Sequence, residues 1–579
     1  MPIAADRSVS PLIGNTVAQS FTPQLVTVLR EGYNLAHLRA DAIAGLTVAI
    51  VALPLSMAIA IASGASPAQG LYTAIVGGFL VSALGGSRFQ IGGPAGAFIV
   101  LILATVNAHG IDGLILATIV SGILLTLVGT LQLGSYIKFI PYPVTVGFTA
   151  GIAVIIFASQ LKELMGLELI GPEPGPLIEK LPVLWQSLSS FTPAAVALSL
   201  TSVMVIVGIK RVRPSWPGML IAVVIGALAA TSLGLPVSTI GTAFGGIPAT
   251  LPLPTLPEVS WEKVLAVMPS AIAFTLLGSI ESLLSALVAD SMTGTRHRSN
   301  SELVAQGIAN IGSGLFGGFC VTGTIARTAT NIRAGAHGPL AGMLHALFLL
   351  LFMLLAAPLA SYIPLASLAG VLAVVAWNMI EKQAFIALLR ASRGDAAVLL
   401  VTFLLTIFRE LTEAIVVGFL LGSVLFIHRL SQTTAIERQF PVTRRHANGA
   451  EPGEQISYDE SSASDPDIVI YRISGAFFFG AAASIGVVLD RIASTHRALI
   501  IDLSQVPLLD STGANTIEML AHKASRRGVK VALTGTTRKT REELFALGIK
   551  PPLVRYEISV ERAVNKLHKS LGSGPAGQP

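Results

Sequence analysis

The stretch SALGGSRFQIGGPA at residues 82–95 and the stretch SGLFGGFCVTGTI at residues 313–325 decide the fold predicted for this chain. In each stretch, a short run that begins with serine ends in two glycines, and a second glycine-containing break follows and leads into a short segment. An apolar segment that is too short to cross a membrane and begins at such a break is typical of a discontinuous helix buried among others, because unpaired backbone cannot face lipid. The two stretches therefore predict two half-helices and an internal repeat.

The composition places these segments in a bilayer. Of the 579 residues, 52% are hydrophobic and 12% are charged, whereas about 25% charged is typical of soluble domains. The first 430 residues hold 37 charged side chains, and the last 149 residues hold 33. We expect a membrane region followed by a soluble region. Nucleic-acid binding is excluded because the basic residues form no stripe with aromatic residues.

The predicted fold class is an α-helical polytopic membrane protein with fourteen transmembrane segments. A spanning helix needs about 20 mostly apolar residues, and long runs of this kind lie near 42–62, 67–86, 111–133, 143–161, 191–209, 217–235, 266–289, 338–360, 366–379, 395–408 and 411–428. Shorter segments at 94–107, 302–316 and 324–333 complete the set. Seven crossings in each repeat, 41–235 and 265–430, force the two copies into opposite orientations, which makes an inverted repeat.

The charge of the loops predicts the orientation. Eleven Lys and Arg residues lie in loops on one side and four on the other, which places both termini in the cytoplasm of a multi-pass protein of the inner (plasma) membrane. The segment 1–40 has no compact apolar stretch with a cleavage site, so no cleaved signal peptide is expected. The cluster Lys210, Arg211 and Arg213 is interpreted as a topology anchor, with lipid recognition as the alternative.

The chain after residue 430 has a different pattern. Residues 431–466 are polar and predict a linker, and residues 467–571 alternate short strands with helices, as in a small α/β domain. Strands are expected at 467–474, 497–503 and 529–534, and helices at 479–495, 512–527, 539–547 and near 559–571. Residues 572–579 predict a disordered tail.

Glu281 is a candidate coupling residue. It is the sole formal charge between Val267 and Val288 and lies near the middle of that segment. A carboxylate at such a depth costs about 2.5–3.5 kcal/mol on insertion scales, so it is expected to face a cavity or a partner. Ser285, one turn further on, could complete an oxygen-lined pocket. The alternative is a carboxylate fixed by a neighbouring helix for packing.

Arg327 is the candidate anion ligand, because it lies in the first turns of the short segment that begins after Gly323 and Thr324. Helix N-termini present free N–H groups and a partial positive charge, and arginine adds a permanent cation with a planar donor fork. Ala95 and Gly96 leave room for a ligand at the other half-helix. The alternative makes Arg327 a static partner of Glu281.

Pro54 and Ser56 lie on the first predicted helix, and they indicate either a simple kink or a lining of the same site. The chain has no nucleophile–base pair, phosphate-binding loop or metal-ligand triad, and its single cysteine is Cys320. We therefore expect neither enzyme activity nor a metal or cofactor.

Four segments of the chain resemble the signatures of the sulfate permease (SulP) anion transporters, including bacterial members. They are AGLTVAIVALPLSMA at 44–58, GGPAG at 92–96, ELVAQGIAN at 302–310 and ARTATN at 326–331. The resemblance implies a core of helices 1–4 and 8–11, a gate bundle, an anion site between the third and tenth helices, a homodimer and an elevator-like motion. It also implies that Glu281 is tied to proton or sodium coupling and that Arg327, which follows Ala326, lies near the anion.

The segment LLDSTG at 508–513 resembles the STAS domain, in which a hydroxyl at the helix start is phosphorylated. The resemblance makes Ser511 a possible regulatory phosphorylation site. The alternative is plain N-capping by Asp510 or Ser511.

These observations predict a secondary transporter of a small anion, such as sulfate, bicarbonate or a C4-dicarboxylate, in symport with protons. A sodium-coupled bicarbonate symporter and an uncoupled exchanger or channel regulated by the STAS domain are the alternatives. A receptor that signals through the STAS domain without transport is a further one. The expected partners are the anion, a proton or sodium ion, membrane lipid and a second copy of the chain.

Overall fold

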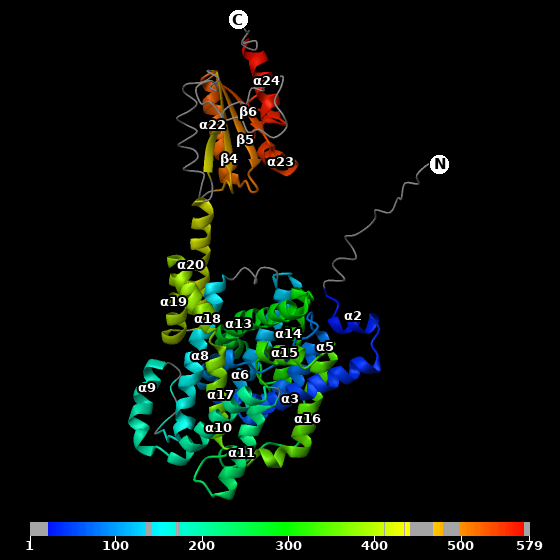
Figure 1. The fold of residues 1–579 in the computed structure, drawn as a ribbon, viewed down its shortest axis with the longest axis vertical. Coiled ribbons are helices and arrows are strands. Elements are labelled where there is room, and N and C mark those ends of the chain that lie inside the picture. The colour runs from blue at the N-terminus through cyan, green and yellow to red at the C-terminus, as the bar shows by residue number, and fades with distance from the viewer. Residues whose placement is uncertain are drawn as a thin grey trace, which may run out of the picture. The chain divides into compact units, whose positions relative to one another are not determined.

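The computed structural model describes residues 21–134, 141–169, 171, 174, 177–214, 216–409, 411–432, 435–439, 467–478 and 497–572. These form two units, Met1–Leu420 and Leu421–Pro579, whose elements are labelled in Figure 1. The predicted helix 479–495, most of the predicted linker and the tail 573–579 lie outside the described residues.

The first repeat begins with a helix that is longer than predicted. Helix α3 (Leu35–Ala62) starts at Leu35 because Asn34 caps it, accepting a hydrogen bond from the His37 amide at 2.9 Å. The membrane elements that follow are α4 (Pro67–Tyr72), continued by the π-helical segment η1 (Thr73–Gly77) and by α5 (Gly78–Leu84), then η2 (Gly96–Phe98), α6 (Ile99–Thr130), α8 (Tyr142–Met165), α10 (Pro193–Val212) and α11 (Gly218–Ser232). Within α6 the backbone breaks at Gly110 (φ 70°, ψ −175°), which separates the two predicted segments 94–107 and 111–133.

The second repeat has the same order of elements. It consists of α13 (Trp261–Thr293), α14 (Ser299–Leu315), α15 (Ile325–Arg333), α16 (Leu340–Ala360), α17 (Leu365–Met379), α19 (Arg393–Phe408) and α20 (Leu411–Gln432). Short connecting helices are α2 (Gln24–Arg30), α9 (Leu177–Gln186), η3 (Ser187–Ser190), α12 (Ile240–Phe244) and α18 (Lys382–Ala391). Each of the fourteen predicted segments contains helix, and within the described residues nine helical spans are long and apolar enough to cross a membrane.

The two repeats meet in an antiparallel sense. Strand β1 (Gly92–Gly93) of the first repeat pairs antiparallel with β2 (Thr322–Gly323) of the second, with Gly92 opposite Gly323. Helix α3 packs on α16, and the equivalent helix α13 of the second repeat packs on α6. This exchange of equivalent contacts is what an inverted repeat requires.

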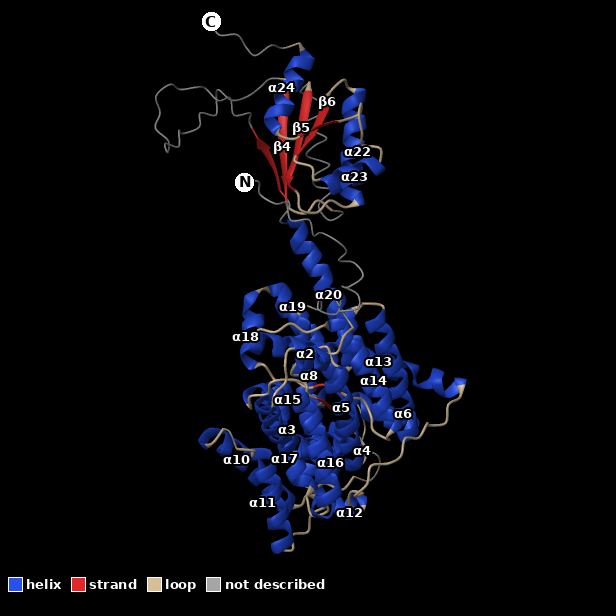
Figure 2. Ribbon diagram, turned by 90° about the vertical axis from the view of Figure 1, so that its right-hand side faces the viewer, coloured by secondary structure: helices blue, strands red, loops and turns tan. Residues whose placement is uncertain are grey.

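The second unit contains a five-stranded sheet in the order β3 (Ala435–Gln439), β4 (Ile468–Ser474), β5 (Ala498–Gln505), β6 (Lys530–Thr534) and β7 (Arg555–Glu557). Strand β3 is antiparallel to β4, and the other pairs are parallel. Helices α22 (Ser511–Arg526) and α23 (Arg538–Ala546) lie on one side of the sheet and α24 (Val560–Leu571) on the other, as Figure 2 shows. The predicted linker 431–466 is therefore corrected in part, because its residues 435–439 form the edge strand of this sheet.

Candidate anion-binding site between the two half-helices

The strand pair β1–β2 brings the beginnings of the two half-helices together. The carbonyl oxygen of Ile91 accepts hydrogen bonds from the amide and the hydroxyl of Thr324, at 2.9 and 3.1 Å. The amide of Ile91 donates to the Thr328 hydroxyl at 3.1 Å. Because η2 follows β1 and α15 follows β2, each half-helix starts beside the other. The first N–H groups of a helix have no partner within it and carry a partial positive charge.

Arg327 lies at this junction and is buried, with 2% of its surface exposed. Its Nη2 donates to the Ser56 hydroxyl on α3 at 3.1 Å and to the Pro94 carbonyl oxygen at 3.3 Å. Its Nε and Nη1 are buried without a hydrogen-bond partner in the described part of the chain. A buried cation with two free donors is costly unless an anion satisfies it.

Gly93 leaves the space that the guanidinium occupies. A Cβ placed on Gly93 would overlap Nη1 of Arg327. A Cβ on Gly96 would lie 3.2 Å from Ile156 of α8 and 3.6 Å from Met379 at the end of α17. The start of η2 thus packs against α8 and α17, three residues after the glycine that contacts Arg327.

The remaining predicted site residues are placed around this junction. Ser56 contacts Arg327 directly, and Pro54 is buried on the same helix. Ala95 is buried, and Ala326 is exposed. Gly323 packs against Gln90, with which a Cβ would overlap.

Glu281 lies in the middle of α13 with 8% of its surface exposed. Among the described residues its carboxylate makes no hydrogen bond and no ion pair, so the alternative of a static pair with Arg327 finds no support. Ser285, one turn on, shares a hydrogen bond of 3.1 Å with the Thr328 hydroxyl rather than with Glu281. Helix α13 is thus tied to α15 at the residue next to Arg327.

Glu302 of α14 is a buried carboxylate that lies outside the predicted set of site residues. Its side chain is fully buried and accepts hydrogen bonds from the Ser87 amide at 2.9 Å, the Gln90 amide group at 2.9 Å and the Ser282 hydroxyl at 3.4 Å. Gln90 immediately precedes Ile91, so the hydrogen bonds of Glu302 fix the segment 87–90 that leads into β1.

The same face of α14 also binds Val321, the residue that precedes β2. The side-chain amides of Gln306 and Asn310 donate to the Val321 carbonyl oxygen at 2.7 and 2.9 Å, and the Val321 amide donates to Asn310 at 3.0 Å. The spacing of four residues from Glu302 to Gln306 to Asn310 puts all three on one helix face. That periodic polar stripe in an apolar bundle was the signal in the sequence that could have identified them.

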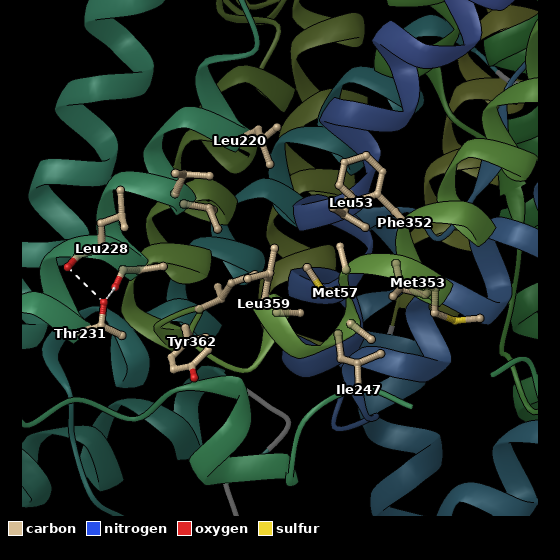
Figure 3. Close-up of a pocket in the computed structure, with 18 residues that line it drawn as sticks. Leu53, Met57, Leu220, Leu228, Thr231, Ile247, Phe352, Met353, Leu359 and Tyr362 are labelled. Carbon is tan, nitrogen blue, oxygen red and sulfur yellow. Dashed lines mark hydrogen bonds between the residues drawn. The ribbon is translucent and has the colours of Figure 1, made fainter. Parts of the chain in front are cut away.

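A cavity of about 400 Å³ lies between α3, α11 and α16. Figure 3 shows Leu53 and Met57 of α3 and Phe352 of α16 lining it together with Leu220 and Leu228 of α11. The Thr231 hydroxyl bonds to the Ala227 and Leu228 carbonyl oxygens of its own helix, at 2.7 and 3.2 Å. The cavity offers no cation to a ligand and is a contact zone between helices rather than an anion site.

In the second unit, Asp510 caps α22. Its Oδ1 accepts a hydrogen bond from the Gly513 amide at 2.8 Å, which confirms the capping interpretation. Ser511 is exposed at the first position of the helix. Phosphorylation of Ser511 stays a prediction.

Comparison with known proteins identifies the membrane unit. A family model described as the sulfate permease family matches residues 38–402, and a STAS domain model matches residues 462–563. The chain belongs to the sulfate permease family. Members of this family are transporters and not enzymes, and the predicted fold class, a polytopic helical membrane domain followed by a STAS domain, is confirmed.

Similar proteins cover nearly the whole of this sulfate permease family member. The putative sulfate transporter YvdB of Bacillus subtilis is 38% identical over 90% of this chain and 95% of its own length. The bicarbonate transporter BicA of Picosynechococcus sp. is 30% identical over 93% of this chain and 97% of its own length.

Two solved structures share the fold. Murine Slc26a9, an anion transporter in the inward-facing state, superimposes with a TM-score of 0.82 at 18% identity, covering 97% of this chain and 96% of its own. The transmembrane domain of a cyanobacterial BicA has a TM-score of 0.59 at 32% identity, covering 67% of this chain and 98% of its own.

Proposed function

We propose that this chain is a secondary active transporter that carries a small anion of the sulfate, bicarbonate or C4-dicarboxylate class together with a proton. The observation that carries the proposal is the buried Arg327, whose Nε and Nη1 have no partner among the described residues, between two half-helix starts. An arginine fork matches an oxyanion or carboxylate in geometry and charge.

Glu281 is proposed to carry the coupling proton. It lies one turn before Ser285, which bonds Thr328 next to Arg327, so the carboxylate and the anion ligand belong to one connected group. If a proton is taken up at Glu281 when the anion binds, each ligand raises the affinity for the other by the same factor, as linkage demands. Such mutual dependence is symport.

The proposed motion is elevator-like. The interface of α3 and α16 with α11 surrounds an apolar cavity in which the Thr231 hydroxyl is already satisfied by its own helix. A surface without hydrogen bonds across it can slide without leaving buried polar groups unpaired. The half-helices, fixed to α14 by Glu302 and Asn310, would move as one body past helices such as α11.

The proposed setting is the inner (plasma) membrane, with both termini and the STAS domain in the cytoplasm and the chain as a homodimer. The excess of Lys and Arg in the loops on the side of the termini supports this orientation. A second candidate is a sodium-coupled bicarbonate symporter, and the 30% identity to the bicarbonate transporter BicA favours bicarbonate as its substrate. In that case Glu281 would bind sodium.

Uptake by proteoliposomes tests the proposal. Purified full-length protein is reconstituted, and labelled sulfate, bicarbonate and a C4-dicarboxylate are offered under a proton gradient, a sodium gradient or neither. Concentration of one anion under the proton gradient is expected, with none in vesicles that carry Arg327→Ala.

Three results would contradict the proposal in different ways. Accumulation that follows sodium alone would favour the bicarbonate alternative. Current proportional to voltage without proton movement would indicate a channel. Anion binding without flux would indicate a receptor that acts through the STAS domain.

A further inference from the structure

A second cavity lies among helices α8, α10 and α17, which pack on one another. Its volume is about 840 Å³, and most of its wall is apolar. Phe157 of α8, Leu200 of α10 and Trp377 of α17 line it and are 48%, 56% and 63% exposed, so the cavity opens as a groove on the outer face of the bundle. For a membrane-embedded chain, this face is surrounded by lipid.

The groove has a basic end. Lys210 and Arg211, in the last turn of α10, belong to its lining. The Lys210 ammonium donates to the Asn378 side-chain oxygen on α17 at 3.4 Å, which holds the cation at the mouth of the groove. On the same side, the Lys382 ammonium lies 3.4 Å from the centre of the Trp377 ring.

No carboxylate neutralises this end within the described residues, because Lys210, Arg211 and Lys382 take part in none of the ion pairs found there. A topology anchor requires basic residues only in the loop. Here Lys210 contacts Asn378 and Lys382 contacts Trp377, and both of these α17 residues line the groove. The arrangement therefore does more than set the orientation.

The groove is long enough for an acyl chain. It follows α10 from Val196 to Arg211, and at 1.5 Å per residue this is roughly 22 Å. One leaflet of the hydrocarbon core is about 15 Å thick.

We infer that this groove binds an anionic phospholipid, with an acyl chain along α10 and the phosphate against Lys210 and Arg211. Basic pockets between transmembrane helices at the cytoplasmic side have this chemistry. A small free anion would gain nothing from the apolar wall, and a zwitterionic lipid would leave the charge of the mouth unbalanced. The inference uses the proposed orientation but not the transport activity, so either can fail without the other.

Trp377 provides the test because it lines the groove. The chain has four tryptophans, and Trp185, Trp216 and Trp261 are replaced by Phe in the full-length protein. The fluorescence of Trp377, then the single tryptophan, is measured in phosphatidylcholine vesicles. These vesicles contain a minor fraction of phospholipid that is brominated on its acyl chains. That phospholipid is either phosphatidylglycerol or phosphatidylcholine. Since bromine quenches tryptophan on contact, the ratio of quenching reports the preference for the anionic head group.

A preference of about fivefold for each basic contact is expected for phosphatidylglycerol, and added salt should reduce it. Lys210→Gln combined with Arg211→Gln should bring the preference close to one. Arg390→Gln with Arg393→Gln removes the same charge at the same end of the bundle, outside the groove, and should leave the preference unchanged.

A further variant, Val203→Phe, narrows the groove without changing its charge and should lower quenching by both lipids. Equal quenching by both brominated lipids in the unsubstituted groove would overturn the inference. So would a preference that survives the double Gln substitution. If neither lipid quenches Trp377, another protein surface, such as a second copy of the chain, covers the groove, and the inference is wrong.

Discussion

Arg327 and Gly93 make one contact that substitution can test from either side. Arg327→Ala removes the cation and should weaken anion binding by about 100-fold or more, because hydrogen bonds to charged groups are worth about 1.5–3 kcal/mol each. Arg327→Lys should retain only part of the anion affinity, because a lysine ammonium is a point charge and lacks the planar donor fork of arginine. Gly93→Ala should weaken binding as well, because its Cβ would displace Nη1.

Anion binding to the purified protein, measured by calorimetry, checks these expectations. Gly208→Ala is the matched control, because a Cβ there meets nothing within 4 Å. Unchanged affinity in Arg327→Ala would exclude the shared site.

Glu281→Gln separates coupling from binding. A permanently neutral side chain of the same shape should still allow anion exchange across the membrane but abolish accumulation driven by a pH gradient. Counterflow and gradient-driven uptake in the same vesicles measure the two activities. Glu258→Gln, which removes an exposed carboxylate, should leave both intact. Undiminished dependence on the proton gradient in Glu281→Gln would mean that another group couples transport.

The sequence makes Glu281 and Arg327 candidate site residues for a physical reason. A lone charge in an apolar segment is costly, and this made Glu281 and Arg327 visible. The contact between Arg327 and Ser56 joins residues 271 positions apart, and no local pattern encodes it. Glu302 was overlooked because it lies in the first turn of α14, where an acidic residue is ordinary.

At the scale of elements, the turn between α15 and α16 is joined to the start of α3 by a cluster of titratable groups. The rings of His37 and His337 stack with their centres 3.6 Å apart, and Asp41 accepts from the amides of His337 and Gly338 at 2.6 and 3.0 Å. The charged or titratable groups that face His337 are Glu31, Tyr33, His37, Asp41 and Arg88. Arg88 Nη2 lies 3.2 Å from His337 Nε2, so this nitrogen accepts and the ring is neutral.

This cluster should loosen on acidification. Burial, with His37 and Arg88 nearby, lowers the pKa of His337 below its usual value. At a pH near these values the unfolded turn therefore binds more protons than the folded turn. The contribution of His337 to the stability of the cluster is complete above the usual histidine pKa, and it declines as the pH falls toward the lowered pKa of the folded state. Exchange of the His337 and Gly338 amides, corrected for intrinsic rates, should speed up from pH 7.5 to 5.5.

Glutamine at His337 can accept from Arg88 and cannot gain a proton, so His337→Gln should remove the pH dependence. His109→Gln, at an exposed position on α6, should retain it. Exchange that does not change with pH in the unsubstituted chain would refute this role.

The cap of α22 is a second element that can be tested. Asp510→Ala removes the acceptor of the Gly513 amide and should cost about 1 kcal/mol, or roughly fivefold faster exchange of that amide. Asp510→Asn keeps an equally good cap and should change little. Equal protection of Gly513 in Asp510→Ala would show that other contacts hold the turn.

The sequence predicted most elements, and the misses have local causes. The short length of the apolar segments and the Gly or Pro breaks before them indicate the half-helices. These signals are strong because unpaired backbone groups cannot face lipid. The sequence of strand β3, AIERQ, predicts a linker because most of its residues are polar. Strand β7, RYE, has three residues and is held by its neighbour β6 rather than by its own pattern.

At the scale of the whole molecule, the two units should fold separately. The unit Met1–Leu420 contains both repeats except for the second half of α20, which ends at Gln432, and β3 belongs to the sheet of the second unit. A chain that ends at Gln432 should be extracted as a monodisperse protein, and residues 433–579 should be soluble alone. Size-exclusion chromatography of both pieces checks this. Aggregation of the chain that ends at Gln432 would show that the two units depend on each other. If that chain folds but transports slowly, the STAS domain has a regulatory role.

The pairing of Gly92 with Gly323 also has a consequence for biosynthesis. Roughly 230 residues separate the partners, and at 5–20 residues per second the ribosome needs about 10–45 s to supply the second one. During that interval the first half-helix has emerged while the backbone groups that β2 will satisfy remain unpaired, a state that hydrocarbon does not tolerate. The nascent first repeat is therefore expected to stay in contact with water or a chaperone, and the proposed anion site forms only when the tenth segment arrives.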